Sequence, residues 1–401
     1  MKEVVIVEGL RTAFGRRGGS LKEFTPSDLA GMTIKGLCSR SKILERYKVD
    51  AVFAGTAWGD VDCNNFARYS TLKAGLPYET SSTFVEMQCG SSIACINMAA
   101  LQIQSEIIDV AIAGGAESHS RTAFKFSTCV TPYKEQPPTA AKMRLSPFDD
   151  DDISMIEVAD RMARKWKITR EECDKFAFDS QMRAKAAIEN GYIKDEIFGI
   201  EVELRGKKEK ETIVIDFDEH PRPATTLEGL AKMKPVMEDG VTTAGNASGL
   251  NDGASFVLMM SREKAEKLGY RPIARWMGGK DVGVDPKYMG IGPAFSNISL
   301  LNRLGLSLSD IDVFECNEAF AAQNLCVIKQ MELMSKERID RKKWNPLGGA
   351  IAFGHPNGAS GGRLCIFAMN QLKRINGKYG LFSACCGGGL GVSTVIENIS
   401  R

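Results

Sequence analysis

Short apolar runs alternate with longer amphipathic stretches along the N-terminal part of the chain. The runs at 4–7, 52–55 and 110–113 are rich in valine and alanine, and they predict buried strands. The stretches at 26–38 and 93–107 carry apolar residues at helical spacing and predict helices. Strands that alternate with helices in this way are typical of a layered α/β domain.

The C-terminal part of the chain repeats this pattern. Strands are predicted at 313–316 and 380–384, with glycine-rich loops around them. The helix between them is indicated by a regular set of apolar residues: Leu364, Phe367, Ala368, Leu372 and Ile375. We therefore expect a second α/β unit near the end of the chain.

The two units resemble each other in the order of their parts. In the first, a loop that contains Cys89 leads into a helix, a strand and then the glycines at 114–115. In the second, a loop that contains His355 leads into a helix, a strand and then the glycines at 387–389. This order indicates an internal duplication. Packing of two related units about a pseudo-twofold axis would make Cys89 and His355 face each other.

The region between the two units differs from them in composition and in its pattern of residues. It combines proline-rich turns, an acidic run at 149–152 and a charged, helix-like stretch at 161–190. We interpret this region as an insertion on the core. We predict an N-terminal half formed by 1–119 with 250–273, an inserted loop domain at 120–249 and a C-terminal half at 274–401.

Composition excludes several classes of protein. The chain has 401 residues, of which 43% are apolar and 25% charged, so it is of the ordinary globular type. A net charge of +2 gives no basis for binding nucleic acid. No apolar run is long enough to span a bilayer, and the chain starts with a strand-like run instead of a signal-peptide pattern. We expect a cytoplasmic protein.

The cysteines and histidines limit the chemistry further. Eleven cysteines, an odd number that includes the adjacent Cys385 and Cys386, are typical of reduced thiols and not of a disulfide framework. A redox role for the adjacent pair is the alternative. With three histidines and no zinc-type cysteine spacing, we expect no metal site.

Cys89 is the candidate nucleophile because it directly precedes a predicted amphipathic helix. The apolar face of that helix has residues three or four apart, which are Ile93, Ile96, Ala100, Ile103 and Ile107. A thiol beside the first turn meets unpaired N–H groups and the positive end of the helix dipole, which can lower a cysteine pKa from about 8.5 to roughly 3.5–7.5. We therefore expect a reactive thiolate. The alternative is an inert buried cysteine.

Six short motifs with small residues follow one another along the chain, and five of them contain cysteine, histidine or asparagine. They are Cys89-Gly90-Ser91, the segment 243–254, the segment 284–293, Asn317-Glu318-Ala319-Phe320, Gly354-His355-Pro356 with the small residues that follow it, and Cys385-Cys386-Gly387-Gly388-Gly389. In this order the set resembles the thiolase family. The resemblance implies a duplicated core of two similar βαβαβ-type halves in a five-layered α-β-α-β-α arrangement, with an inserted loop domain that binds coenzyme A.

The resemblance also implies roles for four residues. Cys89 attacks the ketone carbon of a 3-ketoacyl thioester, and His355 takes the thiol proton. A histidine between glycine and proline in a loop is poorly placed for core packing, which favours catalysis over a structural role. Cys385 is the acid and base that protonates, or generates, the acetyl-CoA carbanion. Asn317 holds a water beside His355.

Two oxyanion sites follow from the same resemblance. The tetrahedral intermediate on Cys89 would meet the backbone N–H groups of Cys89 and Gly387, and the thioester enolate would lie near His355 and the water held by Asn317. Loss of one such donor typically costs about 10²–10³ in rate. Glycines at 387–389 would let the backbone approach the substrate closely, or would supply a turn with positive φ.

Further residues match the substrate-binding positions of the family. Ser248 and Ala244 match the loop that contacts the pantetheine arm, and Arg222 matches a position near the head group of coenzyme A. Bulky residues around the acyl pocket, which suggest a short acyl chain, are Met155, Met289 and Phe320. Coenzyme A is a substrate, so the resemblance implies no cofactor. It implies a homodimer or homotetramer.

Three positions depart from the family pattern. Glu86 stands where an asparagine is common, Asn357 follows His355-Pro356 where many members have an apolar residue, and Ser154 stands where short-chain biosynthetic members have a histidine. None of these changes removes a catalytic group. They leave the acyl-chain preference open, with a medium- or long-chain 3-ketoacyl-CoA thiolase as the alternative.

Three other functions compete with this one. A ketoacyl synthase would need a second histidine, and neither His119 nor His220 matches such a motif. A Cys-His-Asn hydrolase would use Cys89, His355 and Asn317 but would not require a second cysteine. A non-catalytic protein that binds coenzyme A has no need of all four candidate catalytic residues. The sequence does not decide between cleavage and condensation.

Overall fold

The computed structural model describes residues 1–127, 137–141, 143–205 and 210–400. Its centre is a long mixed sheet with the strand order β13-β14-β15-β12-β1-β11-β5-β3-β4. The strands, in chain order, are β1 (Val4–Thr12), β3 (Ala51–Gly55), β4 (Ser81–Val85), β5 (Val110–Ser118), β11 (Asn251–Ser261), β12 (Ala274–Gly283), β13 (Ile311–Cys316), β14 (Tyr379–Cys386) and β15 (Leu390–Asn398). Two short strands pair beside this path, β2 (Gly15–Arg16) and β8 (Ile197–Phe198).

The sheet consists of two similar halves. In one half β3 pairs in parallel with β4 and β5, and β11 is antiparallel to both β5 and β1. In the other half β13 and β14 are parallel, and β15 is antiparallel to both β14 and β12. The halves join through only two residue pairs between β1 and β12, Val5 with Arg275 and Ile6 with Ala274. This arrangement agrees with the predicted duplication.

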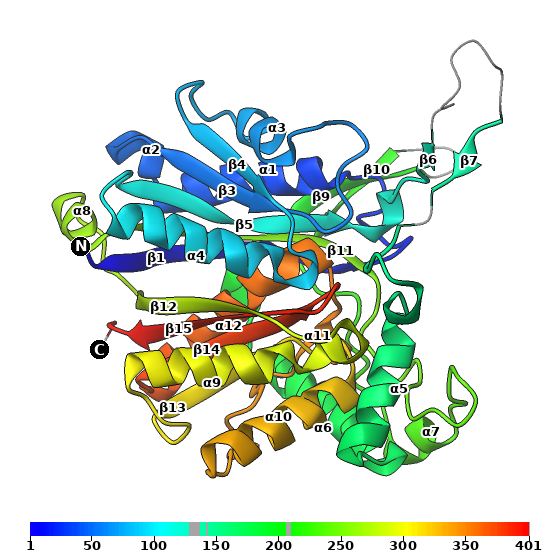
Figure 1. Ribbon diagram of the computed structural model, residues 1–401. Coiled ribbons are helices and arrows are strands. Elements are labelled where there is room, and N and C mark those ends of the chain that lie inside the picture. Colours follow the sequence, from blue (N-terminus) through cyan, green and yellow to red (C-terminus); the bar gives the residue numbers. More distant parts are fainter. Residues whose placement is uncertain (128–136, 142, 206–209, 401) are drawn as a thin grey trace.

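Helices cover both faces of each half-sheet, which gives five layers (Figure 1). The outer helices are α1 (Pro26–Ser41) and α3 (Phe66–Lys73) on one side, and α9 (Gly292–Leu304) and α10 (Ala321–Ser335) on the other. Between the half-sheets lie α4 (Ser91–Gln104) and α12 (Asn357–Ile375), whose apolar residues share one buried cluster with both sheets. The predicted five-layered α/β fold is confirmed.

The inserted region packs against the C-terminal half through α5 (Met155–Trp166) and α6 (Arg170–Glu189). The sequence indicated a single helix-like stretch here, and the structure divides it. Lys167 adopts a left-handed conformation with φ of 52°, and Thr169 caps α6 by accepting the N–H of Glu172, which returns a hydrogen bond. Two helices at an angle to each other therefore replace the expected run.

Shorter elements complete the described chain. The helices are α2 (Ile43–Arg46), α7 (Leu227–Ala231), α8 (Arg262–Lys267) and α11 (Ala350–Phe353), and the strands are β6 (Phe126–Ser127), β7 (Thr139–Ala140), β9 (Ile200–Arg205) and β10 (Lys210–Ile215). The 3₁₀ segments are η1 (Gln88–Gly90), η2 (His119–Arg121), η3 (Asp149–Asp151), η4 (Lys194–Glu196) and η5 (Pro286–Ile291). In the described ranges, no helix combines the length and the apolar character needed to cross a membrane.

The predicted end of the helix after Cys89 was wrong. The structure ends α4 at Gln104, because Glu106 adopts a left-handed conformation with φ of 64° and the N–H of Ile107 turns back to the carbonyl of Gln102. Ile107 is therefore 70% exposed and does not belong to the apolar face. The four earlier positions of that face are fully buried.

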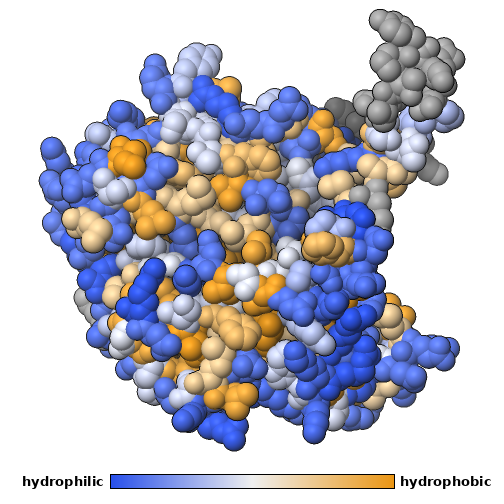
Figure 2. Space-filling view, in the orientation of Figure 1, coloured by the Kyte–Doolittle hydropathy of each residue, from blue (hydrophilic) through white to orange (hydrophobic). Residues whose placement is uncertain are grey.

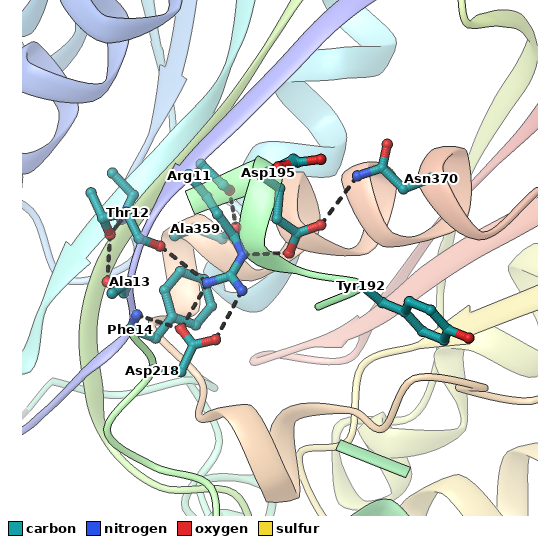
Figure 3. Close-up of polar contacts among 12 residues, drawn as sticks. Arg11, Thr12, Ala13, Phe14, Tyr192, Asp195, Asp218, Ala359 and Asn370 are labelled. Carbon is teal, nitrogen blue, oxygen red and sulfur yellow. Dashed lines mark hydrogen bonds and ion pairs between the residues drawn. The ribbon is translucent and has the colours of Figure 1, made fainter. Parts of the chain in front are cut away.

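A buried ion-pair cluster fixes the inserted region to the core sheet. Arg11 of β1 donates to Glu196 over 2.7 Å and to both carboxylate oxygens of Asp218 over 2.7 and 2.9 Å. Figure 3 shows Arg11 pointing toward Asp218. The side-chain amide of Asn370, in α12, donates to the carboxylate of Glu196 over 3.2 Å. Burial raises the pKa of Glu196, so Arg11 is needed to keep it charged.

We predict that Arg11→Met destabilises the protein by about 3–5 kcal/mol, because it leaves two buried carboxylates without a counter-ion. Urea unfolding measures this effect. The control is Arg338→Met, since the Arg338 side chain is 91% exposed in its pair with Glu332 and its removal leaves the unfolding midpoint unchanged. Equal midpoints for Arg11→Met and the native protein would contradict the prediction.

Candidate active site

Cys89 lies in η1, the tight turn between β4 and α4. Gln88, the residue before it, has a φ of 47°, a conformation that is uncommon for residues other than glycine. Side chains on both sides hold this turn. Glu86 accepts the backbone N–H of Gln88 over 2.8 Å, and Ser91 donates to the carbonyl of Gln88 over 2.7 Å while it accepts the N–H of Met87. The thiol is therefore presented by a constrained backbone.

His355 lies in the loop before α12, and its Nε2 is 3.1 Å from the Sγ of Cys89. The other ring nitrogen, Nδ1, is 2.6 Å from the hydroxyl of Ser360. Because that hydroxyl donates its single proton to the carbonyl of Pro356 over 3.0 Å, it can only accept from Nδ1–H. Nε2 is therefore the unprotonated nitrogen, and its lone pair faces the thiol of Cys89.

Both members of this pair are neutral at rest. Burial lowers the pKa of His355 to about 3. Burial, together with the nearby Cys385 and Glu117, raises the pKa of the Cys89 thiol far above its usual range. The prediction of a lowered thiol pKa was therefore wrong, because the cost of removing a thiolate from water exceeds the effect of the helix N-terminus. His355 is the base within reach of the thiol proton.

Asn317 follows β13 and completes the surroundings of His355. Its Nδ2 lies 3.3 Å from the Nε2 of His355. Its backbone is fixed, because its N–H donates to Ser383 and its carbonyl accepts the side-chain amide of Asn324 over 2.9 Å. The Oδ1 of Asn317 is buried and has no hydrogen-bond partner in the described part of the chain. One acceptor therefore remains free at this point of the site.

Cys385 lies near the end of β14, and burial raises the pKa of its thiol to about 12. Its neighbour Cys386 points to the opposite face of the sheet and packs in the core cluster between the half-sheets. Gly387 follows, and a Cβ there would lie 3.1 Å from the side chain of Gln88, so this turn adjoins the loop of Cys89. Gly389 has a φ of 93° and supplies the positive-φ conformation of the turn.

Glu117, at the end of β5, was not identified from the sequence. Its buried carboxylate accepts the hydroxyl of Thr56 and the backbone N–H groups of Ala57 and Gly358, over 2.8–3.0 Å. Burial raises its pKa to about 7. A Cβ at Gly358 would lie 2.5 Å from the carbonyl oxygen of Ala116, so only glycine allows this contact. Glu117 thus joins the start of α12 to the ends of β3 and β5.

One more polar side chain reaches the nucleophile, and it connects the sulfur to a second histidine. The Nδ2 of Asn357 lies 3.4 Å from the Sγ of Cys89, and its Oδ1 lies 2.9 Å from the Nε2 of His119. The sequence marked Asn357 as a departure from the family pattern and did not connect it with His119. A contact between residues 238 positions apart leaves no signal in a single sequence.

The predicted coenzyme A residues gather at a cavity of about 340 Å³. Arg222 and Ala244 line it, together with His220 and the residues on either side of Ser248. The N–H of Ser248 donates to the carbonyl of Ala319 over 3.0 Å, within the Asn317 motif. The cavity wall is therefore continuous with the segment that carries a catalytic candidate.

The predicted acyl-pocket residues share a core cluster with Cys385. Met289 of η5 is buried in it, and Met155 of α5 and Phe320 are partly buried against it. Phe320 also pairs with Ala247 through an isolated bridge, which connects it to the loop of the cavity. In the described residues, no group of three histidine, cysteine, aspartate or glutamate side chains could hold a metal ion.

Comparison with known proteins identifies relatives along the whole chain. The family model described as Thiolase, N-terminal domain, matches residues 4–263, and the model described as Thiolase, C-terminal domain, matches residues 270–398. The 3-oxoadipyl-CoA/3-oxo-5,6-dehydrosuberyl-CoA thiolase of Escherichia coli (strain K12) is 40% identical over 410 residues, which cover 100% of both chains.

Solved structures of a thiolase and of an acetyl-CoA acetyltransferase are similar to this chain over almost its whole length. The acetyl-CoA acetyltransferase of Bacillus anthracis matches with a TM-score of 0.92 and 38% identity, over 100% of this chain and 99% of the other. The human mitochondrial 3-ketoacyl-CoA thiolase in complex with CoA matches with a TM-score of 0.88 and 38% identity, over 99% of this chain and 98% of the other.

We predict that His355 makes the protein less stable as the pH falls. The unfolded chain binds a proton at this histidine below about pH 6.5, whereas the folded chain, with a pKa of about 3, does not. Unfolding therefore becomes easier between pH 6.5 and 3. Between pH 6 and 4.5, the native protein should lose about 2 kcal/mol more than His355→Gln in urea unfolding.

The comparison of the two proteins isolates His355. Glu117 acts in the opposite direction, because its raised pKa stabilises the fold as the pH falls below about 7, but it is present in both proteins. Parallel losses of stability in the native protein and in His355→Gln would contradict the prediction.

Proposed function

The chain belongs to the thiolase family, and from that premise we propose how its residues transfer an acyl group between a 3-ketoacyl-CoA and coenzyme A. The observation that carries the proposal is the distance of 3.1 Å between the Sγ of Cys89 and the unprotonated Nε2 of His355. This is the arrangement of an activated nucleophile, in which a base and a thiol lie within hydrogen-bonding reach.

In the cleavage direction, Cys89 attacks the ketone carbon of the substrate while its proton passes to His355. A tetrahedral alkoxide forms, and the bond between C2 and C3 breaks. The products are an acyl group on Cys89 and the carbanion of acetyl-CoA, whose charge is delocalised onto the thioester oxygen. Because Cys89 and His355 are neutral and buried at rest, charge develops only during the attack and the bond cleavage. Hydrogen-bond donors that are already in position stabilise such developing charge most effectively.

Two oxyanion sites serve these charges. The alkoxide accepts the backbone N–H groups of Cys89 and Gly387, and the enolate oxygen accepts from His355 and from a water held by Asn317. The free, buried Oδ1 of Asn317 supports the second assignment, since a water that donates to it would still have a proton for the enolate. Removal of one donor typically costs about 10²–10³ in rate.

Cys385 supplies the proton for the leaving carbanion, which gives acetyl-CoA. The resulting Cys385 thiolate then takes the proton of coenzyme A, whose sulfur attacks the acyl group on Cys89 and releases the shortened acyl-CoA. Cys89 leaves as a thiolate and regains its proton from His355, which restores the neutral pair. Run backwards, the same steps condense two acetyl-CoA molecules to acetoacetyl-CoA, with Cys385 as the base. In that direction Cys385 first gives its proton to the departing coenzyme A. The thiolate that remains is a strong base, because the pKa of the Cys385 thiol is raised to about 12, and it removes the α-proton.

Coenzyme A enters as a substrate through the cavity lined by Arg222 and Ala244, with Ser248 at its rim. The cationic side chain of Arg222 is exposed and suits the phosphates of the head group. The pantetheine arm would follow the segment that runs from Ala244 toward Leu250, which forms a bridge with His355. We assign no resident cofactor and no metal.

We propose a short acyl chain, because the bulky side chains of Met155, Met289 and Phe320 belong to, or pack against, the core cluster that contains Cys385. The alternative is a medium- or long-chain 3-ketoacyl-CoA. The relatives leave both open, since one is named for acetyl-CoA and another for 3-ketoacyl-CoA substrates.

Two other mechanisms fit the site less well. A hydrolase would use Cys89, His355 and Asn317, but it gives no role to the buried thiol of Cys385. A ketoacyl synthase would place a second histidine at the nucleophile, whereas His119 contacts the side chain of Asn357 and His220 lines the cavity.

A homodimer or homotetramer is part of the proposal. β4 is the last strand of the sheet, so one of its edges is free to pair or to be covered. The adjoining α4 exposes Met98 and Leu101, with Ile107 beyond its end, by 38%, 53% and 70%. Figure 2 shows apolar residues across the middle of the face on which α4 lies in Figure 1. A second copy of the chain would cover such a surface.

The domain division and the compartment are also proposed. We assign 1–119 with 250–273 to the N-terminal half and 274–401 to the C-terminal half, which is supported by the pairing of β11 with β5 and of β12 with β15. The region 120–249 is the inserted domain. The described cysteines are free thiols, which supports a reducing compartment such as the cytoplasm.

We predict that Cys89→Ala and Cys385→Ala each lower the thiolysis of acetoacetyl-CoA by several orders of magnitude, roughly the 10⁴–10⁶-fold that other enzymes lose with a nucleophile. Spectroscopic loss of the substrate measures the rate. Cys326→Ala is the matched control, because this buried thiol in α10 has no place in the mechanism. Turnover by Cys385→Ala near the native rate would contradict the two-cysteine mechanism and favour the hydrolase-like alternative.

We also predict that kcat/KM for acetoacetyl-CoA exceeds that for 3-ketooctanoyl-CoA by at least about 10-fold, since each poorly fitting methylene costs roughly 1 kcal/mol or more. Met289→Ala should shift the ratio toward the longer substrate. Met259→Ala, a buried methionine of β11 in the other half, should leave the ratio unchanged. Equal or better turnover of the longer substrate by the native protein would contradict the assignment of a short chain.

A further inference from the structure

Asn357 connects the nucleophile to a second histidine. Its Nδ2 lies 3.4 Å from the Sγ of Cys89, and its Oδ1 lies 2.9 Å from the Nε2 of His119. His119 is 6% exposed and belongs to η2, directly after β5. The three residues come from the Cys89 turn, the start of α12 and the end of β5, so the contact forms only in the folded chain.

The direction of the two hydrogen bonds follows from their atoms. An amide oxygen only accepts, so His119 donates from Nε2–H to the Oδ1 of Asn357. This bond orients the amide, because a reversed amide would place its NH₂ group against Nε2–H. The Nδ2–H of Asn357 therefore points at the sulfur of Cys89. Burial lowers the pKa of His119, so its ring is neutral and supplies this donor without a charge.

The sulfur needs such a donor. Burial raises the pKa of Cys89, with Cys385 and Glu117 as further causes, whereas a backbone N–H and the side-chain amide of Asn357 lower it. In the described residues, the side chains that hydrogen-bond to the Sγ of Cys89 are His355 and Asn357. His355 serves as the base that takes the proton. Asn357 has no part in that transfer, and its N–H group can stabilise the negative sulfur that remains.

We propose that Asn357 is a further catalytic residue, whose side-chain N–H stabilises the Cys89 thiolate as it forms and as it leaves the acyl group, and that His119 is its positioning residue. The proposal rests on the assignment of Cys89 as the nucleophile. It also explains a departure from the family pattern, in which many members have an apolar residue after the His-Pro pair. An apolar side chain at this position offers the sulfur no hydrogen bond.

The first test compares the native protein with Asn357→Leu, which keeps a similar volume and removes the amide. We measure the rate of alkylation of Cys89 by iodoacetamide at pH 7.5 by mass spectrometry of the Cys89 peptide. This rate should fall about 10-fold, which is at the low end of the range expected for loss of a hydrogen bond to a charged group. For acetoacetyl-CoA, kcat should fall by a similar factor with KM unchanged. An unchanged alkylation rate would overturn the proposal.

A second variant guards against simple misfolding. Asn357→Asp has nearly the same shape but presents a carboxylate to the sulfur, so its alkylation rate should fall further than that of Asn357→Leu. A rate equal to that of the native protein would overturn the role of the N–H group.

The positioning role of His119 has its own test. His119→Leu should slow alkylation about 3-fold, since the amide of Asn357 is then free to rotate, and His119→Gln should restore most of the rate through its own N–H donor. In the Asn357→Leu background, His119→Leu should have no further effect. Independent, multiplying losses would overturn the link between the two residues.

These measurements separate the inference from the proposed function. Alkylation needs no thioester substrate. If the native protein fails to cleave acetoacetyl-CoA, the proposed substrate is wrong, while the alkylation ratio of native protein to Asn357→Leu still tests the inference. If Cys89 itself resists alkylation while Cys385 reacts, both the nucleophile assignment and this inference are overturned.

Discussion

The packing of α12 against the ends of β3 and β5 is the constraint on which the active site depends. Gly358 leaves no space for a side chain at this contact, and the carboxylate of Glu117 binds the backbone N–H groups on both sides of it. Because α4 and α12 share the layer between the half-sheets, this contact also fixes the distance between their first turns. Cys89 and His355 stand at those turns, so the geometry of the middle layer is also the geometry of the catalytic pair.

The burial of Cys89 and His355 determines the kind of chemistry that follows. Burial keeps Cys89 as a thiol and His355 as a neutral imidazole, with Ser360 selecting the tautomer that presents Nε2. A permanent thiolate would be costly here, whereas charge that appears only during the reaction can be met by fixed N–H donors. The backbone donors and the amide of Asn357 have this property. The surrounding fold therefore keeps the resting pair neutral and holds its N–H donors in place for the charge that develops during the reaction.

The sequence was sufficient where the argument rested on order and periodicity. The alternation of elements predicted the α/β class, and the parallel order of the two halves predicted that Cys89 and His355 would face each other. It was insufficient where burial decides, since the helix N-terminus suggested a lowered thiol pKa and only the packed structure shows that Cys89 is buried, with 9% of its surface exposed. Long-range polar contacts, such as those of Glu117 and of His119 with Asn357, need the fold before they can be recognised.

The central claim is that Cys89 carries the acyl group between two halves of the reaction. It is tested most directly by incubating the protein with acetyl-CoA alone, quenching in acid and mapping the acetyl group by peptide mass spectrometry. The account predicts one acetyl group on the peptide that contains Cys89, which disappears when free coenzyme A is added before the quench. An acetyl group on Cys385, or on neither cysteine while the protein still turns over acetoacetyl-CoA, would contradict it.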